Sequence, residues 1–189
     1  MTAAAPLQDR RILVGICGGI AAYKTAALVS KLVQQGADVR AAMTQSAQRF
    51  VGPLTFESLT GKPVQSSQWK RDDHPTSQHV GLARWAQLMV IAPATANTLA
   101  KLAAGLASDA VTTIALALPA GTPVLLAPSM NAEMWRNPLT QRNLRTLLDL
   151  MGWTTVGPDA GWQACRTEGE GRMAEPDAIV QAAVAALSA

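Results

Sequence analysis

The sequence is poor in aromatic and in charged residues. Phenylalanine, tryptophan and tyrosine make up 4% of its 189 residues and charged residues 15%, whereas hydrophobic residues of all kinds make up 49%. With so few aromatic rings, alanine, valine, leucine and isoleucine must fill the interior, which favours helices packed on a buried sheet over an all-β sandwich. So much apolar material with so little charge also excludes a disordered chain.

Cysteine is scarce as well, and the two present, Cys17 and Cys165, form neither a CxxC motif nor a set with metal-ligand spacing. This excludes a disulfide framework, gives no reason to expect a metal site and is typical of a reducing compartment. No apolar h-region opens the chain, and no apolar run reaches the ~20 residues that cross a bilayer. We therefore expect a cytoplasmic protein with no membrane partner.

The charge is not of the kind that binds nucleic acid. The formal net charge is +3, but the basic residues are scattered and no aromatic stacking platform lies beside them. We therefore expect no nucleic-acid partner, whereas the mild positive charge suits a small anionic ligand.

Short apolar runs alternate with segments of helical periodicity along most of the chain. The expected strands are residues 11–16, 38–43, 88–93, 123–128 and 154–156, and the expected helices are residues 20–36, 97–105, 143–151 and 176–187. This order predicts an α/β fold with a doubly wound, Rossmann-like (flavodoxin-like) parallel sheet in three layers. The length predicts a single domain, residues 11–189, preceded by a flexible leader at residues 1–10.

Two segments lack a clear period. Polar turns interrupt the stretch from Thr44 to His79, and within it Lys70–Thr76 is a loop long enough to reach a neighbouring subunit. Around Cys165, glycines and the guanidinium groups of Arg166 and Arg172 predict a flexible cationic loop that closes over an anionic substrate. Nearby positive charge favours the thiolate of this cysteine.

In a doubly wound fold, ligands bind beyond the carboxyl ends of the strands, and unusual residues gather there in this sequence. Gly18 and Gly19 follow the first strand, where backbone N–H groups and a helix start can hold a phosphate. Thr44 and Ser46, after the second strand, add hydroxyl groups. A tight turn and an ordinary helix cap are the alternative explanations.

The third strand leads to groups that suit a flat heterocycle. Thr95, Asn97 and Thr98 carry hydroxyl and amide groups that can read its edge, with helix capping as the alternative. No GxGxxG motif occurs and no acidic residue ends the second strand, which argues against NAD. A flavin mononucleotide would use both clusters.

Three further residues are candidates for chemistry, each with a structural alternative. His79 can titrate near neutral pH and act as a base, or it can be a structural histidine. Asn131 can bind a carboxylate through its neutral amide, or it can cap a helix. Cys17 adjoins an apolar strand and is expected to be an inert buried thiol.

Several segments together resemble one family, the flavin-containing cysteine decarboxylases, and within it the phosphopantothenoylcysteine decarboxylases. The matching segments are Gly15–Lys24, Gln78–Val80, Ala92–Thr98, Pro128–Trp135 and Ala164–Met173. The Pro-x-Met-Asn-x-x-Met-Trp element is the most specific, and it stands in the family's order between the histidine and the cysteine.

This resemblance implies an FMN-dependent carboxy-lyase of coenzyme A biosynthesis. The enzyme would convert 4′-phosphopantothenoylcysteine into 4′-phosphopantetheine through oxidation to a thioaldehyde, loss of CO2 and re-reduction of the enethiol, with His79 as the base and Cys165 as the proton donor. By resemblance, FMN would be held by Gly18, Gly19, Ile20, Thr44, Ser46, Thr95, Ala96, Asn97, Thr98 and Ser129. The substrate would be contacted by Asn131, Met134, Gln163 and Ala164.

The sequence departs from the family pattern at two positions. The family commonly has Ser or Thr where Cys17 stands, and Gly where Arg166 follows the active cysteine. The first departure removes a hydroxyl near the phosphate, and the second changes the loop over the substrate. The resemblance also implies a homotrimer or a multiple of it, with FMN near a subunit interface, and allows for a phosphopantothenoylcysteine synthetase domain or partner.

Three alternatives remain open. A peptidyl-cysteine oxidative decarboxylase of the lantibiotic type would share the flavin and the histidine but would not need the Cys165 loop. A flavin prenyltransferase of the same fold should lack the Pro-x-Met-Asn pattern coupled to a cysteine loop. A non-enzymatic flavoprotein regulator would be marked by a long acidic tail, which residues 180–189 do not provide.

Overall fold

The computed structural model describes residues 5–67 and 78–188. The strands are β1 (Arg11–Ile16), β2 (Asp38–Met43), β3 (Leu88–Ala94), β4 (Val124–Pro128), β5 (Thr154–Thr155), β6 (Asp159–Trp162) and β7 (Glu168–Arg172). The helices are α1 (Ala22–Gln34), η1 (Ala47–Arg49), α2 (Pro53–Thr60), α3 (Gln78–Trp85), α4 (Ala96–Ala103), α5 (Ala110–Leu116), α6 (Ala132–Arg136), α7 (Pro138–Met151) and α8 (Pro176–Ser188). The expected loop Lys70–Thr76 lies outside the described residues.

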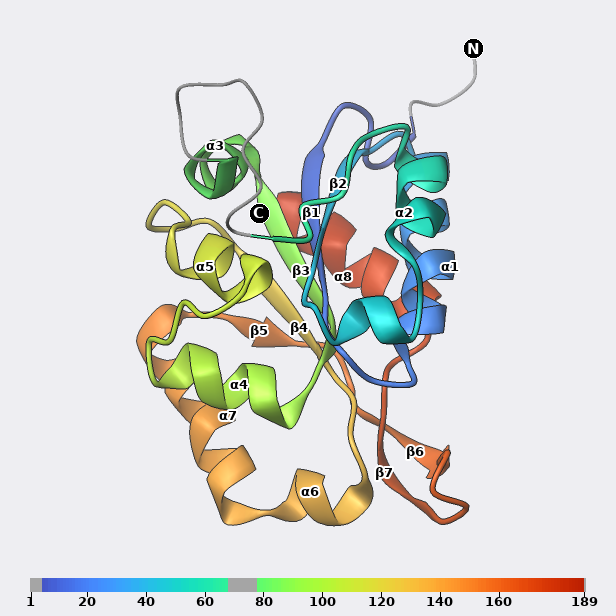
Figure 1. The fold of residues 1–189 in the computed structure, drawn as a ribbon, viewed down its shortest axis with the longest axis vertical. Helices are drawn as coiled ribbons and strands as arrows, with labels where there is room; N and C mark the ends of the chain where they lie inside the picture. Colours follow the sequence, from blue (N-terminus) through green and yellow to red (C-terminus); the bar gives the residue numbers. More distant parts are fainter. Residues whose placement is uncertain (1–4, 68–77, 189) are drawn as a thin grey trace.

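Five parallel strands form the main sheet, in the order β2-β1-β3-β4-β5 (Figure 1). This is the order of a doubly wound, flavodoxin-like sheet, so the predicted α/β class is confirmed. The pairing of β3 with β4 shifts register between Ile91 and Ala94. Pro93 lies within the shift, and its ring nitrogen has no hydrogen to donate to the ladder.

Helices cover both faces of this sheet and make three layers. The first face packs against α1, α2 and α8, and the second against α3, α4, α5 and α7 (Figure 1). Side chains from β1 alternate between the two cores: Ile12 and Val14 enter the first, and Leu13 enters the second. Burial on both faces is the reason why the strands appear as continuous apolar runs in the sequence.

The predicted elements agree with the structure where the apolar pattern is strong. β1 and β2 have the predicted bounds, whereas α7 begins at residue 138 rather than 143. The earlier start follows from Asn137, whose side chain accepts a hydrogen bond from the Leu139 N–H at 2.9 Å, and from Pro138 at the first helical position. The short helices α2, α3, α5 and α6 were not predicted, because each presents only one or two turns of mixed polarity.

The part of the expected leader that the structure describes packs against the domain. Leu7 is fully buried in the first core, and its N–H donates to the carbonyl of Gln35 at 3.1 Å. Asp9 N–H bonds to the carbonyl of Gly36 at 3.0 Å. Residues 5–10 therefore belong to the folded domain, because one apolar side chain in the polar leader fills the space beside the end of α1.

The segment around Cys165 is an antiparallel hairpin rather than the expected irregular loop. Its strands β6 and β7 pair from Asp159 with Arg172 to Trp162 with Glu168, and Cys165 lies in the turn between them. The hairpin stands apart from the main sheet, below the carboxyl ends of its strands in Figure 1. The glycines that suggested irregular structure are positions of close packing, as described below.

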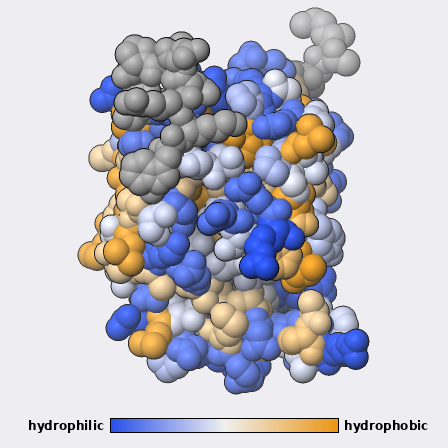
Figure 2. Space-filling view, in the orientation of Figure 1, coloured by the Kyte–Doolittle hydropathy of each residue, from blue (hydrophilic) through white to orange (hydrophobic). Residues whose placement is uncertain are grey.

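Among the helices that the structure describes, none has the length and apolar character needed to cross a membrane. Figure 2 shows hydrophilic residues across the middle of one face, with hydrophobic residues in separate small patches.

Truncating the Leu7 side chain tests its role in the core. We expect Leu7→Ala to lower the free energy of unfolding by about 2–5 kcal/mol, because it leaves a cavity in the first core beside the end of α1. Leu150, 78% exposed on α7, is the matched control, and Leu150→Ala should cost less than about 0.5 kcal/mol. Denaturant titration followed by circular dichroism measures both, and equal stability of the two variants would contradict the burial of the leader.

Candidate functional site

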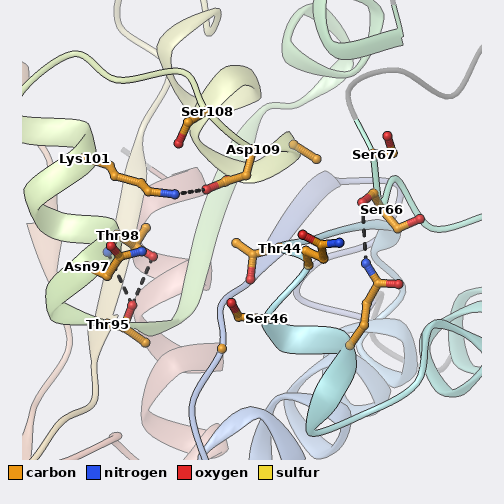
Figure 3. Close-up of a pocket in the computed structure, with 14 residues that line it drawn as sticks. Thr44, Ser46, Ser66, Ser67, Thr95, Asn97, Thr98, Lys101, Ser108 and Asp109 are labelled. Atoms are coloured by element: carbon orange, nitrogen blue, oxygen red, sulfur yellow. Dashed lines mark hydrogen bonds and ion pairs between the residues drawn. The ribbon is translucent and has the colours of Figure 1, made fainter.

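A polar cavity of about 790 Å³ opens at the carboxyl ends of β1, β2 and β3. Figure 3 shows Thr95, Asn97 and Thr98 on one side of it, facing Thr44 and Ser46 on the other. The lining residues are Gly18, Thr44, Gln45, Ser46, Gln48, Ser66, Ser67, Thr95, Asn97, Thr98, Lys101, Ser108, Asp109 and Ala110. The two predicted clusters of hydroxyl groups therefore lie in one cavity, although they are about fifty residues apart in the chain.

A second cavity of about 660 Å³ adjoins the first and shares Gly18, Thr95 and Asn97 with it. It extends between the start of α1, the segment after β4 and the β6–β7 hairpin. Its lining residues are Gly18, Gly19, Ile20, Ala21, Tyr23, Lys24, Thr95, Ala96, Asn97, Ser129, Met130, Asn131, Met134, Trp162, Gln163, Ala164, Cys165, Gly171, Arg172 and Met173. Every predicted site residue except His79 thus lines one of two continuous cavities.

Gly18 is required by the close approach of two segments. A Cβ atom at this position would lie 2.4 Å from Cβ of Ser46, a distance that real Cβ atoms do not adopt. The glycine therefore brings the turn after β1 against the start of η1. At the start of α1, the N–H groups of Ala22 and Lys24 donate to the carbonyls of Gly19 and Ala21 at 3.0 and 2.9 Å, so an anion there would be held by the backbone of the turn that precedes the helix.

Thr44 and Ser46 have different roles. The Thr44 hydroxyl accepts a hydrogen bond from the Ala47 N–H at 3.1 Å, and this side chain is buried, so the capping alternative holds for it. Ser46 is exposed and makes no capping bond. Of the two hydroxyl groups, the one on Ser46 is the more available to a ligand.

The residues after β3 combine capping with access to the cavity. Thr95 is the N-cap of α4, because its hydroxyl accepts from the Thr98 N–H at 3.3 Å. The two threonine hydroxyls lie 3.1 Å apart, and Thr98 is buried. Asn97 is exposed and lines both cavities, which leaves its amide available to a ligand.

Sequence reasoning missed an ion pair in the polar cavity. Lys101 Nζ on α4 lies 2.9 Å from Asp109 Oδ2, and both side chains line the cavity (Figure 3). Asp109 also caps α5 in a reciprocal arrangement with Thr112. The Asp-x-x-Thr spacing of this capping box was visible in the sequence and would have predicted the start of α5.

Asn131 and Cys165 meet in the second cavity. The Asn131 Oδ1 atom accepts from the N–H of Glu133 at 2.9 Å and caps α6. Its Nδ2 atom then points to Cys165 and donates to Sγ at 3.4 Å. Capping and ligand binding were alternatives for this residue in the sequence. In the structure Oδ1 caps the helix, and Nδ2 faces the cavity, where it can bind a ligand.

The environment of Cys165 favours the thiolate. Hydrogen bonds from the side chains of Thr167, whose Oγ1 lies 3.0 Å from Sγ, and of Asn131 lower the pKa of this exposed thiol below its usual value. Arg166, next in the turn, has φ +65°, a left-handed conformation that glycine adopts without strain. Arg166 therefore holds a backbone conformation that is strained for a residue with a side chain.

Gln163 connects the hairpin to the segment after β4. It is only 6% exposed, and its Oε1 atom accepts from the Ala132 N–H at 3.2 Å while its Nε2 atom donates to the carbonyl of Glu170 at 3.3 Å. A Cβ atom at Gly171 would lie 2.3 Å from the carbonyl oxygen of Met130, so only glycine fits. The predicted substrate residue Gln163 therefore acts first as a buried link that positions the turn.

Cys17 is fully buried, and burial raises its pKa to about 12. A thiol in this state is neither a nucleophile nor a proton donor near neutral pH, as expected. Among the described residues, no three His, Cys, Asp or Glu side chains come together as a metal site.

His79 is not among the residues that line either cavity. It lies in the first turn of α3, and α3 and the β6–β7 hairpin lie at opposite ends of the molecule (Figure 1). The described residues of one chain therefore do not bring this histidine to Cys165.

Known proteins with similar sequences belong to a flavoprotein family. The sequence pattern of the Flavoprotein family matches residues 2–188. The coenzyme A biosynthesis bifunctional protein CoaBC of Vibrio cholerae is 47% identical over 174 residues, which cover 92% of this chain and 43% of the relative. The chain thus spans less than half the length of the curated relatives it matches first.

Solved structures with the same fold include two decarboxylases. A PPC decarboxylase mutant complexed with pantothenoylaminoethenethiol has a TM-score of 0.85 and 34% identity, and the match covers 96% of this chain and all of that one. The FMN-dependent cysteine decarboxylase SpaF has a TM-score of 0.81 and 31% identity, and the match covers 99% of this chain and 100% of the SpaF chain. Because the family pattern matches nearly every residue, the chain belongs to the Flavoprotein family.

Proposed function

We propose that the chain catalyses the FMN-dependent decarboxylation of 4′-phosphopantothenoylcysteine to 4′-phosphopantetheine. The observation that carries this proposal is the contact between the Asn131 amide and the Cys165 thiol, inside a cavity continuous with a second one rich in hydroxyl groups. A carboxylate-binding group and a proton donor thus share one site beside a site for a cofactor. The similarity to PPC decarboxylase and to CoaBC supports the same substrate.

The residues present fit FMN. Gly18 leaves the turn after β1 without a side chain, and the backbone of this turn together with the exposed Ser46 hydroxyl suits a phosphate. Thr95, Ala96, Asn97 and Ser129 line the continuation of this space toward Asn131 and suit the flavin ring. Bound there, FMN would supply the hydride acceptor and donor that a cysteine α-carboxylate needs in order to leave as CO2.

In this proposal Asn131 Nδ2 holds the substrate carboxylate. The capping bonds of Oδ1 fix the amide, so that its N–H groups face the cavity. A neutral donor suits this task, because a fixed positive charge would stabilise the carboxylate that has to be lost. Met134 and Ala164 line the same cavity and exclude water around the reacting carbon.

Cys165 acts as the proton donor to the enethiol. Its position in the turn is fixed by Thr167 and by the hairpin bonds of Gln163, and its lowered pKa makes the thiol a better acid than an ordinary cysteine. This residue distinguishes the proposed reaction from that of a peptidyl-cysteine decarboxylase, which would stop at the enethiol. The similarity to SpaF keeps the latter as the second candidate.

The base would come from a second copy of the chain. His79 is our candidate for it, yet it does not line the cavity of its own chain. We therefore propose a homotrimer or a multiple of it, in which His79 of one subunit faces the cavities of its neighbour. The curated relatives are bifunctional, so we also propose a phosphopantothenoylcysteine synthetase as an attached domain or partner, in the cytoplasm.

The cofactor proposal predicts a yellow protein with about one non-covalent FMN per chain. Gly18→Ala should lose FMN, because its Cβ atom would force η1 away. Gly81→Ala is the control, since a Cβ atom there meets nothing within 4 Å. Absorbance at flavin wavelengths after gel filtration measures the bound fraction, with circular dichroism as the check of folding. Parent protein that stays colourless after addition of FMN would rule out the assignment.

The proton-donor proposal predicts that Cys165→Ser separates the two halves of the reaction. A hydroxyl is far less acidic than a thiol, so CO2 loss should continue while the enethiol accumulates, two hydrogens short of the product. Those two hydrogens would stay on the reduced FMN, which dissolved oxygen would reoxidise for the next turnover. Mass spectrometry of the reaction mixture distinguishes the two compounds. Cys17→Ser is the control and should form 4′-phosphopantetheine, because that thiol is buried and protonated. Formation of 4′-phosphopantetheine by Cys165→Ser at the parent rate would show that the proton has another source.

Mixed assemblies test the origin of the base. His79→Asn and Cys165→Ser should each be inactive in forming 4′-phosphopantetheine. Co-expressed at equal levels, they should recover about one quarter of the activity, because random mixing in a cyclic oligomer places intact His79 and intact Cys165 at that share of the interfaces. Recovery is measured after purification through two different tags. No recovery in a verified mixed oligomer would mean that both residues act within one subunit.

A further inference from the structure

A cluster of two cations and one carboxylate lies at the edge of the second cavity. Lys24 Nζ is 2.6 Å from Glu175 Oε1, and Arg172 NH2 is 3.0 Å from the same oxygen. Lys24 and Arg172 line the cavity, whereas Glu175 does not. The cluster as a whole carries one net positive charge. Nothing in the reaction proposed above requires it.

Packing holds both cations in place. The Lys24 side chain is only 15% exposed and comes from the first turn of α1. A Cβ atom at Gly161 would lie 2.6 Å from the Arg172 NH1 atom, so the glycine allows the guanidinium group to lie across β6. The sequence predicts a cationic loop in this region, and in the structure Arg172 lines the cavity from the end of β7.

The carboxylate is the most exposed member of the cluster. The hydrogen bond from Lys24 lowers the pKa of Glu175, so the group is ionised near neutral pH. Its side chain is 55% exposed, and water can therefore replace the cations around it. Without a counter-ion, two like charges would face each other across the rim of the cavity. Glu175 thus reduces the repulsion between the two cations, and an anion that binds them more strongly can displace its carboxylate.

We propose that Lys24 and Arg172 form a phosphomonoester subsite, which binds the 4′-phosphate of the substrate, and that Glu175 is the counter-ion displaced on binding. This inference rests on the proposed function. A phosphate carries nearly two negative charges near neutral pH and three acceptor oxygens, which match an ammonium and a guanidinium group better than one carboxylate oxygen does. The aromatic side chains of Tyr23 and Trp162 line the cavity together with the two cations and suit the uncharged arm between phosphate and cysteine.

A second ion pair between the same parts of the chain serves as the control. Lys31 on α1 lies 2.8 Å from Asp177 in the first turn of α8. Neither residue lines the cavity. If the role of Lys24 and Glu175 were only to connect α1 with the start of α8, the two pairs would respond alike to mutation.

The test compares substrates with and without the phosphate. The parent holoenzyme should have a higher kcat/KM for 4′-phosphopantothenoylcysteine than for pantothenoylcysteine. Lys24→Met and Arg172→Met should each reduce this ratio by about 10- to 100-fold through KM, as expected for loss of one charge-assisted hydrogen bond. Glu175→Gln should leave the ratio unchanged or raise it, because it removes a competing anion. Lys31→Met should leave kcat/KM unchanged for both substrates.

Each outcome separates the subsite from the reaction. If the parent protein decarboxylates neither substrate, the proposed function is wrong. If it decarboxylates both and the Lys24→Met and Arg172→Met variants keep the parent ratio, the reaction stands and the phosphate subsite is wrong. Calorimetric binding of 4′-phosphopantetheine and of pantetheine provides a readout independent of turnover. A variant that lost affinity for both compounds equally would indicate a purely structural cluster.

Discussion

The proposed site depends on one close contact between two backbones. Gly171 in β7 lies so near the segment after β4 that a Cβ atom would meet the Met130 carbonyl oxygen at 2.3 Å, and the Met130 N–H donates to the Gly171 carbonyl at 2.9 Å. This contact fixes the hairpin below the sheet. It brings Cys165 to Asn131, and it places Arg172 at the rim of the same cavity. A side chain at Gly171 would move all three groups together.

Helix caps supply much of the polar lining of the two cavities. Thr95, Asp109 and Asn131 each cap a helix that begins at or near the carboxyl edge of the sheet. A capping side chain is held by the backbone N–H groups that it accepts from, so its other atoms are fixed as well. Asn131 shows the consequence most clearly, because capping leaves only its N–H groups to face the cavity. Capping and ligand binding are therefore joint roles in this fold rather than alternatives.

Charge is arranged differently in the two cavities. In the polar cavity, Lys101 is neutralised by Asp109, whose side chain is itself only 16% exposed. In the second cavity, Lys24 and Arg172 share one exposed carboxylate and keep a net positive charge. A balanced, partly buried pair suits a lasting structural role, whereas an excess positive charge with an exposed counter-ion suits an anion that binds and leaves.

The sequence by itself determined the elements with a strong period and the residues at the strand ends. β1 and β2 were predicted to the residue: β1 is buried from Ile12 to Ile16 and appears as an apolar run, and β2 follows the turn at Gly36 and ends in the buried residues 41–43. The parallel order placed Gly18, Ser46, Thr95 and Asn131 near one edge without any knowledge of distances. Leu7 could not be assigned to the core, because a single apolar residue in a polar segment has no period.

Only the tertiary structure decided which of these residues meet. The glycines around Cys165 suggested flexibility, yet Gly169 and Gly171 are small because β7 packs against the segment after β4. The ion pair between Lys24 and Glu175 joins residues about 150 positions apart, and no local pattern predicts such a pair. Likewise, only the placement of α3 separates His79 from the cavities of its own chain. Local propensity and periodicity act over a few residues, whereas these contacts depend on how complete layers pack.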